Sequence, residues 1–389
     1  MPGHSVSHVV PDHHWPVLTL AAIPQPDNQP ETPMNSTPFS SRRHLLAACA
    51  LVLCSAGLPG LATAQAIKTK VVDMGELSPG LGSEANAINN AGRTVGRAMS
   101  NVDFQYRQVI WDNLNLQEFD NCCSGFLPTI RSINLGGEVV GDYFATRDDS
   151  IPVYWDAQGT AFNLPALGPF SFGFANAINN IGQIAGASYD ANLDVHAVVW
   201  DRASQVHDLG FLGEPAPGFK RYAVAKGINN LGHVVGQGLI GMDQHAFVWR
   251  NGTYTDLGLG AATHINDAGL IAGYASGIIP VTWTNGVRSN LRALGGGRTA
   301  YGHLVNGINN KGDLVGYAPA PNPGVFTIAV LWRGGRAISL GHYPGGNNSY
   351  ASGINDNGVI VGSGNLVPGG PMHALRWTVT TRGVAVELQ

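Results

Sequence analysis

The sequence is poor in charged residues. Only 12% of its 389 residues are Asp, Glu, Lys or Arg, against roughly 25% in an average soluble domain. A disordered chain is rich in charge and poor in apolar residues, so a chain with 44% hydrophobic residues is expected to fold over most of its length. Lys and Arg number 22 and Asp and Glu 26, and no basic run occurs. This balance argues against a nucleic-acid partner.

Cysteine is also scarce. Cys49 and Cys54 lie near the N-terminus, and the other two, Cys122 and Cys123, are adjacent in sequence. In an oxidising compartment, Cys122 and Cys123 either close a vicinal disulfide or stay reduced. No other Cys or His stands near them at the spacing of metal ligands, so we expect no metal there.

The N-terminal 64 residues are expected to direct export. Residues 1–40 lack apolar periodicity, and Ser41-Arg42-Arg43 then precedes a short apolar run that ends at Ala62-Thr63-Ala64. Paired positive charges, a short apolar core and a small-x-small ending are typical of a secretory signal peptide, here cleaved near Ala64. Because Gly and Pro interrupt this run, it is too short for a membrane span, which needs about 20 apolar residues.

The export route and the start of translation stay open. The order Ser-Arg-Arg-x-Leu-Leu from Ser41 resembles the bacterial twin-arginine signal, and a general secretory signal explains the same residues. Export would proceed equally well from Met34. We therefore expect residues 1–64 to be an N-terminal extension plus signal peptide. Residues 65–389 would form a single domain, without a membrane span, in the periplasm or outside the cell.

Glycine is abundant, with 52 residues, and much of it belongs to a repeat. The pattern I-N-x-x-G-x-x-x-G occurs seven times, starting at Ile88, Ile133, Ile178, Ile228, Ile265, Ile308 and Ile354. A Trp follows each copy, at Trp111, Trp155, Trp200, Trp249, Trp283, Trp332 and Trp377. Six of the seven third positions are Asn or Asp, and Leu135 is the exception. Matching registers of this kind indicate an array of similar structural units.

Each unit is predicted to contain four antiparallel strands. The first strand ends at Ile-Asn, and the Asx-x-Gly that follows is expected to form a hairpin turn in which Gly adopts a positive φ. We expect the second strand to end at the second Gly and the third at the Trp. A further strand ends near a Leu, as in Asp208-Leu209-Gly210. Turn chemistry accounts for the Asn residues, so calcium is not needed to explain them.

The unit length of about 45 residues predicts an all-β fold, a seven-bladed β-propeller of four-stranded blades. A closed ring removes the unpaired strand edges that an open β-solenoid, the alternative, would expose. The Leu-type strand also occurs before the first unit, at Val72-Asp73-Met74-Gly75, and at the end, at Val386-Glu387-Leu388. We therefore expect a strand from one terminus to complete a blade formed by the other.

The unit resembles the HAF repeat of bacterial extracellular proteins, which is named for a His-Ala-Phe triplet. The triplet is His245-Ala246-Phe247 here, with variants that begin at His196 and His373. Four units carry Arg107, Ile151, Ile279 and Ile328 in place of the His. The resemblance covers residue 70 to the end. It implies export and a β-rich repeat fold, and it brings no established reaction.

No catalytic motif is recognisable. The sequence lacks G-x-S-x-G, H-E-x-x-H and a phosphate-binding loop. The Trp residues could form platforms for sugars, but one Trp per unit at a fixed position is typical of packing between blades. We expect no cofactor and no metal, and a binding function rather than an enzyme.

The connections between units point to a binding face. The turns after Asn keep one length, whereas the segments from the second Gly to Trp and from Leu to the next Ile vary, and nine of the eleven Tyr lie in these variable segments. Variable loops on a fixed scaffold commonly bind ligands. The candidate binding residues are Tyr143, Tyr189, Tyr222, Tyr301, Tyr343 and Tyr350. The partner would be a glycan or a protein of the cell envelope. The alternative is a secreted enzyme acting on polysaccharides or other polymers at the mouth of the propeller channel.

Overall fold

The computed structural model describes residues 67–119, 129–144, 150–276, 279–295, 304–320 and 326–381. The chain divides into two units, Met1–Ala62 and Thr63–Gln389, and every described residue belongs to the second. In these ranges all the regular elements are β-strands, and no helix is long and apolar enough to cross a membrane. Cys122, Cys123, Tyr301 and the expected cleavage site near Ala64 lie outside the described residues.

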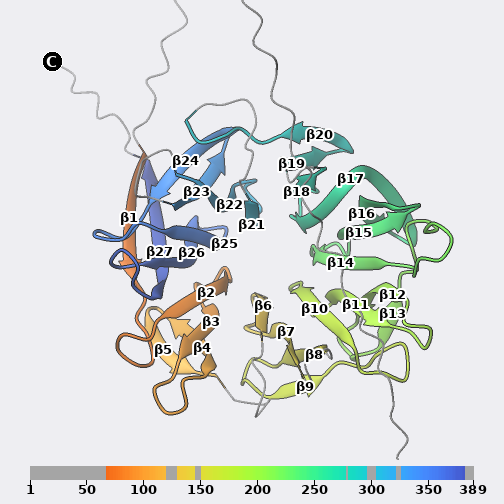
Figure 1. Ribbon diagram of the computed structural model, residues 1–389, viewed down its shortest axis with the longest axis horizontal. Coiled ribbons are helices and arrows are strands. Elements are labelled where there is room, and N and C mark those ends of the chain that lie inside the picture. Colours follow the sequence, from red (N-terminus) through yellow and green to blue (C-terminus); the bar gives the residue numbers. More distant parts are fainter. Residues whose placement is uncertain are drawn as a thin grey trace, which may run out of the picture. The chain divides into compact units, whose positions relative to one another are not determined.

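The strands form seven four-stranded antiparallel blades around a central axis (Figure 1). Blades 1 to 3 consist of β2 Ser83–Ile88, β3 Thr94–Met99, β4 Tyr106–Asp112 and β5 Asn115–Glu118; β6 Thr129–Ile133, β7 Val139–Phe144, β8 Ser150–Trp155 and β9 Ala161–Asn163; and β10 Gly173–Ile178, β11 Ile184–Tyr189, β12 Val195–Trp200 and β13 Val206–Asp208. Blades 4 and 5 consist of β14 Ala223–Ile228, β15 Val234–Ile240, β16 Asp243–Arg250, the shared β17 Thr253–Ile265, β18 Ile271–Ala275, β19 Ile279–Thr284 and β20 Val287–Asn290. Blade 6 consists of β21 Leu304–Ile308, β22 Leu314–Pro319, β23 Thr327–Arg333 and β24 Arg336–Gly341. Blade 7 consists of β25 Ser349–Ile354, β26 Val359–Asn365, β27 Met372–Thr381 and the N-terminal β1 Ile67–Asp73.

Blade 7 confirms that one terminus completes a blade of the other. β1 pairs with β27 along its whole length, from Ile67 opposite Thr381 to Asp73 opposite Leu375. Blade 7 in turn joins blade 1, where the Asn355 side chain donates a hydrogen bond to the Asn89 carbonyl at 3.0 Å. The ring is therefore closed, and the propeller prediction is confirmed over the solenoid.

The hairpin turns have the predicted chemistry. In the first turn the Asn89 carboxamide oxygen accepts the Arg93 N–H at 3.0 Å, and Gly92 adopts a φ of +88°. The corresponding Gly of all seven units has a φ between +74° and +88°, a conformation that costs other residues free energy.

The prediction that the second strand ends at the second Gly is wrong. Gly96 lies inside β3, which continues to Met99. A Cβ at Gly96 would lie 2.0 Å from the Glu84 carbonyl oxygen on the innermost strand β2. The second Gly is therefore required because two backbones approach closely, and not because the chain turns there.

Packing between blades forms the core. Trp200, for example, is fully buried in one cluster with Val140 of the preceding blade. Six of the seven Trp are at most 2% exposed: Trp111, Trp155, Trp200, Trp283, Trp332 and Trp377. Burying one indole removes roughly 150–250 Å² from water, worth about 4–6 kcal/mol at about 25 cal/mol per Å².

Trp249 departs from this prediction, because it is half-buried. In blade 4 the fully buried Phe247 approaches Gly236, with a ring atom 2.7 Å from the position of a Cβ there. In blade 3 the Trp200 ring comes equally close to Gly186. Phe247 thus occupies the space that the Trp fills elsewhere, and Trp249 is displaced toward the surface.

Candidate ligand-binding site

Every innermost strand contains a β-bulge at the same position. In β2 the register shifts between Ala85 and Ala87, so that Asn86 is the additional residue. The same shift occurs in the other six blades. The seven bulge residues are Asn86, Arg131, Asn176, Lys226, Thr263, Asn306 and Ser352. Bulges redirect side chains, and here the redirected side chains line the central axis.

Two cavities lie along the axis, separated by the seven Ile residues of the repeat, which line both. Six of these Ile side chains are 7–9% exposed. The first cavity, which we name the Asn-turn cavity, has a volume of about 160 Å³ and lies on the side of the hairpin turns. The second, which we name the bulge cavity, has a volume of about 220 Å³ and lies on the side of the variable connections. Three residues per blade line the bulge cavity: the bulge residue, the residue after it and the Ile.

The Asn-turn cavity is bounded by a continuous ring of hydrogen bonds. In each blade the Asn after the Ile donates its side-chain N–H to the backbone carbonyl of the equivalent Asn in the next blade, at 2.9–3.2 Å. These residues are Asn89, Asn134, Asn179, Asn229, Asn266, Asn309 and Asn355, each 3–5% exposed. The invariant Asn thus has two roles: it caps its own turn and connects its blade to the next.

A second, more exposed ring is formed by the following residue of each unit. Its side-chain oxygen accepts the backbone N–H of the equivalent residue in the preceding blade, as Asn230 does from Asn180 at 2.8 Å. Six such bonds are present. The seventh cannot form because Leu135 has no acceptor. The carboxylates of Asp267 and Asp356 are held by amide side chains, including Asn310 at 3.1 Å from each.

The bulge cavity carries positive charge. The Arg131 guanidinium forms an ion pair with Asp142, which is completely buried and also accepts a hydrogen bond from Ser150 at 3.0 Å. The half-buried Lys226 has no hydrogen-bond or ion-pair partner among the described residues. Desolvation, together with the charge of Arg131, lowers the pKa of Lys226. No Asp or Glu of the described ranges lines the cavity.

His264 lines the same cavity at a position where the other six blades have Ala, Ser or Gly. Desolvation, with a smaller contribution from Lys226, lowers the pKa of His264 to about 4. Its Nδ1 lies 2.8 Å from the Thr263 hydroxyl oxygen, and that hydroxyl donates to the Ala272 carbonyl. A hydrogen bond with the Asn306 backbone raises the pKa of His264 and opposes part of the effect of desolvation.

The candidate Tyr residues do not form one patch. All five described residues are half-buried: Tyr143, Tyr189, Tyr222, Tyr343 and Tyr350. Tyr189 and Tyr222 pack against one small apolar cluster between blades 3 and 4, and burial raises the pKa of both. Tyr350 packs edge-on against Tyr317 at 4.9 Å, Tyr343 contacts the core between blades 6 and 7, and Tyr143 that between blades 1 and 2. Their role in binding stays a prediction.

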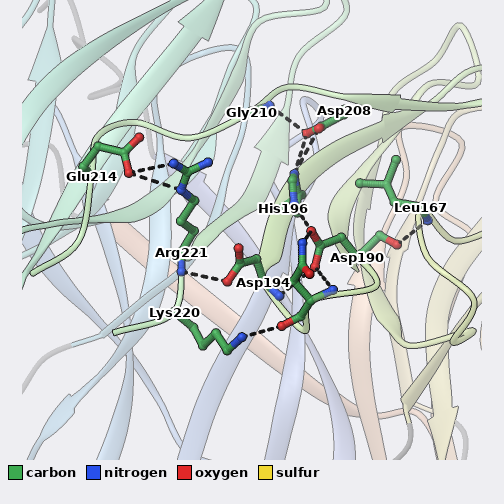
Figure 2. Close-up of polar contacts among 11 residues, drawn as sticks. Leu167, Asp190, Asp194, His196, Asp208, Gly210, Glu214, Lys220 and Arg221 are labelled. Carbon is green, nitrogen blue, oxygen red and sulfur yellow. Dashed lines mark hydrogen bonds and ion pairs between the residues drawn. The ribbon is translucent and has the colours of Figure 1, made fainter. Parts of the chain in front are cut away.

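Figure 2 shows the variable connections of blades 3 and 4 around His196. The Nδ1 atom of His196 lies 3.0 Å from the Asp208 carboxylate, which also accepts the Gly210 N–H at 2.7 Å. His245 pairs in the same way with Asp256 at 3.0 Å, whereas the Nδ1 atom of His373 lies 3.5 Å from the Asp73 carboxylate and makes no hydrogen bond to a described residue. His196 and His245 therefore join the third strand to the end of the outermost strand. The three triplet His residues do not line either axial cavity, and among the described residues no cluster of His, Cys, Asp and Glu is arranged to hold a metal ion.

The sequence prediction missed the residues of the bulge cavity. A signal was present: two residues before each repeat Ile, the chain has Asn in three units and Arg, Lys, Thr or Ser in the others. A polar residue at that point of a buried strand is unusual. Simple alternation would not have assigned it to the axis, because the bulge changes which way the side chain points.

Comparisons with known proteins support the fold. No family model and no curated protein matches the chain. Among solved structures it is similar to streptogramin B lyase, with a TM-score of 0.53 and 10% identity over 80% of this chain and 98% of that chain. A puromycin-hydrolyzing peptidase of Mycobacterium tuberculosis gives 0.49 and 11% over 80% and 55%, and TolB of Acinetobacter baumannii gives 0.33 and 16% over 44% and 41%. At these identities the likeness concerns the β-propeller fold alone.

Proposed function

We propose that this protein is an exported binding module whose ligand lies in the bulge cavity, on the side of the variable connections. The observation that carries the proposal is the variation at the bulge position. The bulged backbone, the second repeat Gly on the adjacent strand and the repeat Ile are the same in all seven blades, whereas the bulge residue is an amide, a hydroxyl, an ammonium or a guanidinium. A uniform scaffold that presents different polar groups to one cavity is what recognition of an asymmetric ligand requires.

The size of the cavity restricts the ligand. A volume of about 220 Å³ takes several waters or one small molecule. An envelope glycan would therefore enter with a single terminal residue, while its remaining residues contact the variable connections. A protein partner would use the connections and their Tyr residues instead, and would leave the cavity free.

The proposal that the protein is exported is supported by the N-terminal residues and by the repeat. The arginine pair, the apolar run and the Ala-x-Ala ending at Ala64 are typical of a signal peptide. The resemblance to the HAF repeat of bacterial extracellular proteins agrees with this localisation. We therefore place the binding module in the periplasm or outside the cell.

An enzyme acting on polymers is the second candidate. One observation favours it, since Lys226 and His264, two groups able to transfer protons, line a single cavity. General acid–base catalysis of glycoside cleavage uses a pair of carboxylates, and the part of the chain that the structure describes places no Asp or Glu in the lining of this cavity. We therefore rank binding above catalysis.

The test is a glycan-array and envelope-extract binding screen with the full chain and with a variant whose cavity is filled. Ser352 is suited to this purpose because it lines the cavity and lies at a bulge, where a larger side chain points to the axis. Ser352→Trp should abolish binding and keep the melting temperature. Tyr343→Ala is the matched comparison, because Tyr343 lies outside the cavity. Ligand binding that survives Ser352→Trp and is lost in Tyr343→Ala would move the site to the loops, and a ligand consumed during the assay would favour the enzyme.

A further inference from the structure

The bulge cavity has a marked imbalance of charge. Two of its seven bulge residues, Arg131 and Lys226, are cations, and they belong to blades 2 and 4 on either side of blade 3. Among the described residues, no carboxylate lines the cavity to balance them. The imbalance is specific to this end of the axis, because the described lining of the Asn-turn cavity contains the carboxylates of Asp267 and Asp356 and no Lys or Arg.

The two cations are not equivalent. Arg131 is neutralised by the buried Asp142 behind the cavity wall. Lys226 has no such partner among the described residues, although its burial makes the isolated charge unfavourable. A half-buried ammonium that lines a cavity, with a second cation near enough to lower its pKa, would be stabilised by an anion bound there.

Neutral groups around the cations add hydrogen-bonding capacity. Asn86, Asn176 and Asn306 each donate one side-chain N–H to a backbone carbonyl of the next blade, at 2.8–3.0 Å. That bond fixes each carboxamide and leaves its other N–H and its oxygen available to a ligand. Ser352 supplies a hydroxyl on the opposite side of the ring from Lys226.

We propose that the bulge cavity binds a small hydroxylated ligand through an oxyanion, a carboxylate or a phosphate, which is held by the Lys226 ammonium and the Arg131 guanidinium. Lys226 supplies the uncompensated charge. Arg131 keeps its bond to Asp142 and offers its remaining N–H groups. The fixed carboxamides bind the hydroxyls. An acidic monosaccharide or a sugar phosphate has this chemistry and fits the available volume.

This inference rests on the proposed function, since it names the ligand class of the same cavity. The experiment is calorimetric titration of the full chain at pH 7 and low salt with glucuronate, glucose 6-phosphate and glucose. The first two carry the oxyanion on different groups and so separate a carboxylate from a phosphate, and glucose is the neutral control. We expect one of the anions to bind at least about tenfold more tightly than glucose, equivalent to about 1.4 kcal/mol.

Two lysine variants test the residue assignment. Lys226→Gln should weaken binding of the anion at least about tenfold and leave the affinity for glucose unchanged. Lys220→Gln removes the same charge from an exposed connection, where the ammonium bonds the Asn192 carbonyl, and should alter affinity less than twofold. Arg131 is not substituted, because removing its guanidinium would leave the buried Asp142 carboxylate without its ion-pair partner. Far-ultraviolet circular dichroism and the melting temperature confirm that each variant is folded.

The binding results distinguish failure of the oxyanion assignment from failure of the proposed binding function. If glucose binds as well as the anions, or if Lys226→Gln has no effect while Ser352→Trp abolishes binding, the oxyanion assignment is wrong and the cavity remains the site. If Ser352→Trp leaves binding intact, both proposals are wrong. If neither anion binds at concentrations up to about 10 mM, the oxyanion assignment is also overturned.

Discussion

The buried ring of Asn side chains gives the sharpest stability prediction, and Asn229 is the most informative member. Its side-chain N–H donates to the Asn266 carbonyl of the next blade at 3.0 Å. Its side-chain oxygen accepts the N–H groups of Leu231 at 3.1 Å and His233 at 2.9 Å. The residue is 3% exposed, so water has little access to replace these bonds.

Asn229→Ala removes all three hydrogen bonds at once. At a net value of about 1 kcal/mol for each bond, the free energy of unfolding should fall by about 3 kcal/mol. Asn229→Asp keeps the two accepted bonds and replaces the donor with a carboxylate facing the Asn266 carbonyl. We expect it to be at least as destabilising, because the buried charge is then directed at an acceptor.

The neighbouring Asn230 is the control. Its side chain bonds Asp267 at 2.8 Å and the Asn180 N–H at 2.8 Å in the outer ring, where solvent reaches the partners. Asn230→Ala should therefore cost about 1 kcal/mol or less. Urea unfolding followed by Trp fluorescence measures all three variants. Equal, small losses for Asn229→Ala and Asn230→Ala would refute the idea that the inner ring holds neighbouring blades together.

Three further predictions concern the second Gly of the repeat, the cavity and the core. Gly236→Ala should destabilise by at least about 3 kcal/mol, because its Cβ would lie 2.0 Å from a backbone oxygen. Gly241→Ala, which has open space and a φ of +63°, should cost only about 1–2 kcal/mol in thermal unfolding. A folded-state pKa of about 4 for His264 against an ordinary value of 6.5 means that the folded state favours the neutral imidazole. The contribution of neutral His264 to the free energy of unfolding is therefore complete above pH 6.5 and is lost as the pH falls toward 4. At about 1.4 kcal/mol per pKa unit, the free energy of unfolding falls by up to about 3 kcal/mol. His264→Gln should make the free energy of unfolding nearly independent of pH across that range. An unchanged pH dependence would contradict the desolvation of His264. Trp200→Ala should cost about 3–5 kcal/mol, and Trp249→Ala distinctly less because Trp249 is half-buried. Matching losses in chemical denaturation would contradict the displacement of Trp249.

Much of the fold could be predicted because the residues that determine the local structure occur within each repeat. A Gly that needs a positive φ and an Asn that caps the turn act within a few residues, and both are visible in sequence. The completion of blade 7 by β1 was also predictable, since a Leu-type strand before Ile88 had no blade of its own. Seven repetitions made each of these local inferences more secure.

The role of the second Gly could not be predicted from the sequence. Its position was evident, but its neighbour Val224, whose carbonyl a Cβ at Gly236 would contact, lies twelve residues earlier on another strand. The place of Trp249 likewise depended on Phe247, whose ring occupies the space over Gly236. Both are consequences of packing, in which the size of one side chain decides the position of another.

The sequence by itself determined the number of blades, the turn chemistry and the seven-fold arrangement, because these depend on local backbone preferences repeated along the chain. Only the tertiary structure decided which residues face the axis. A bulge changes the direction of one side chain per blade, and ring closure then brings Arg131, Lys226 and His264 to one cavity although the first and last are more than a hundred residues apart. Their convergence depends on long-range geometry, which no local pattern in the chain encodes.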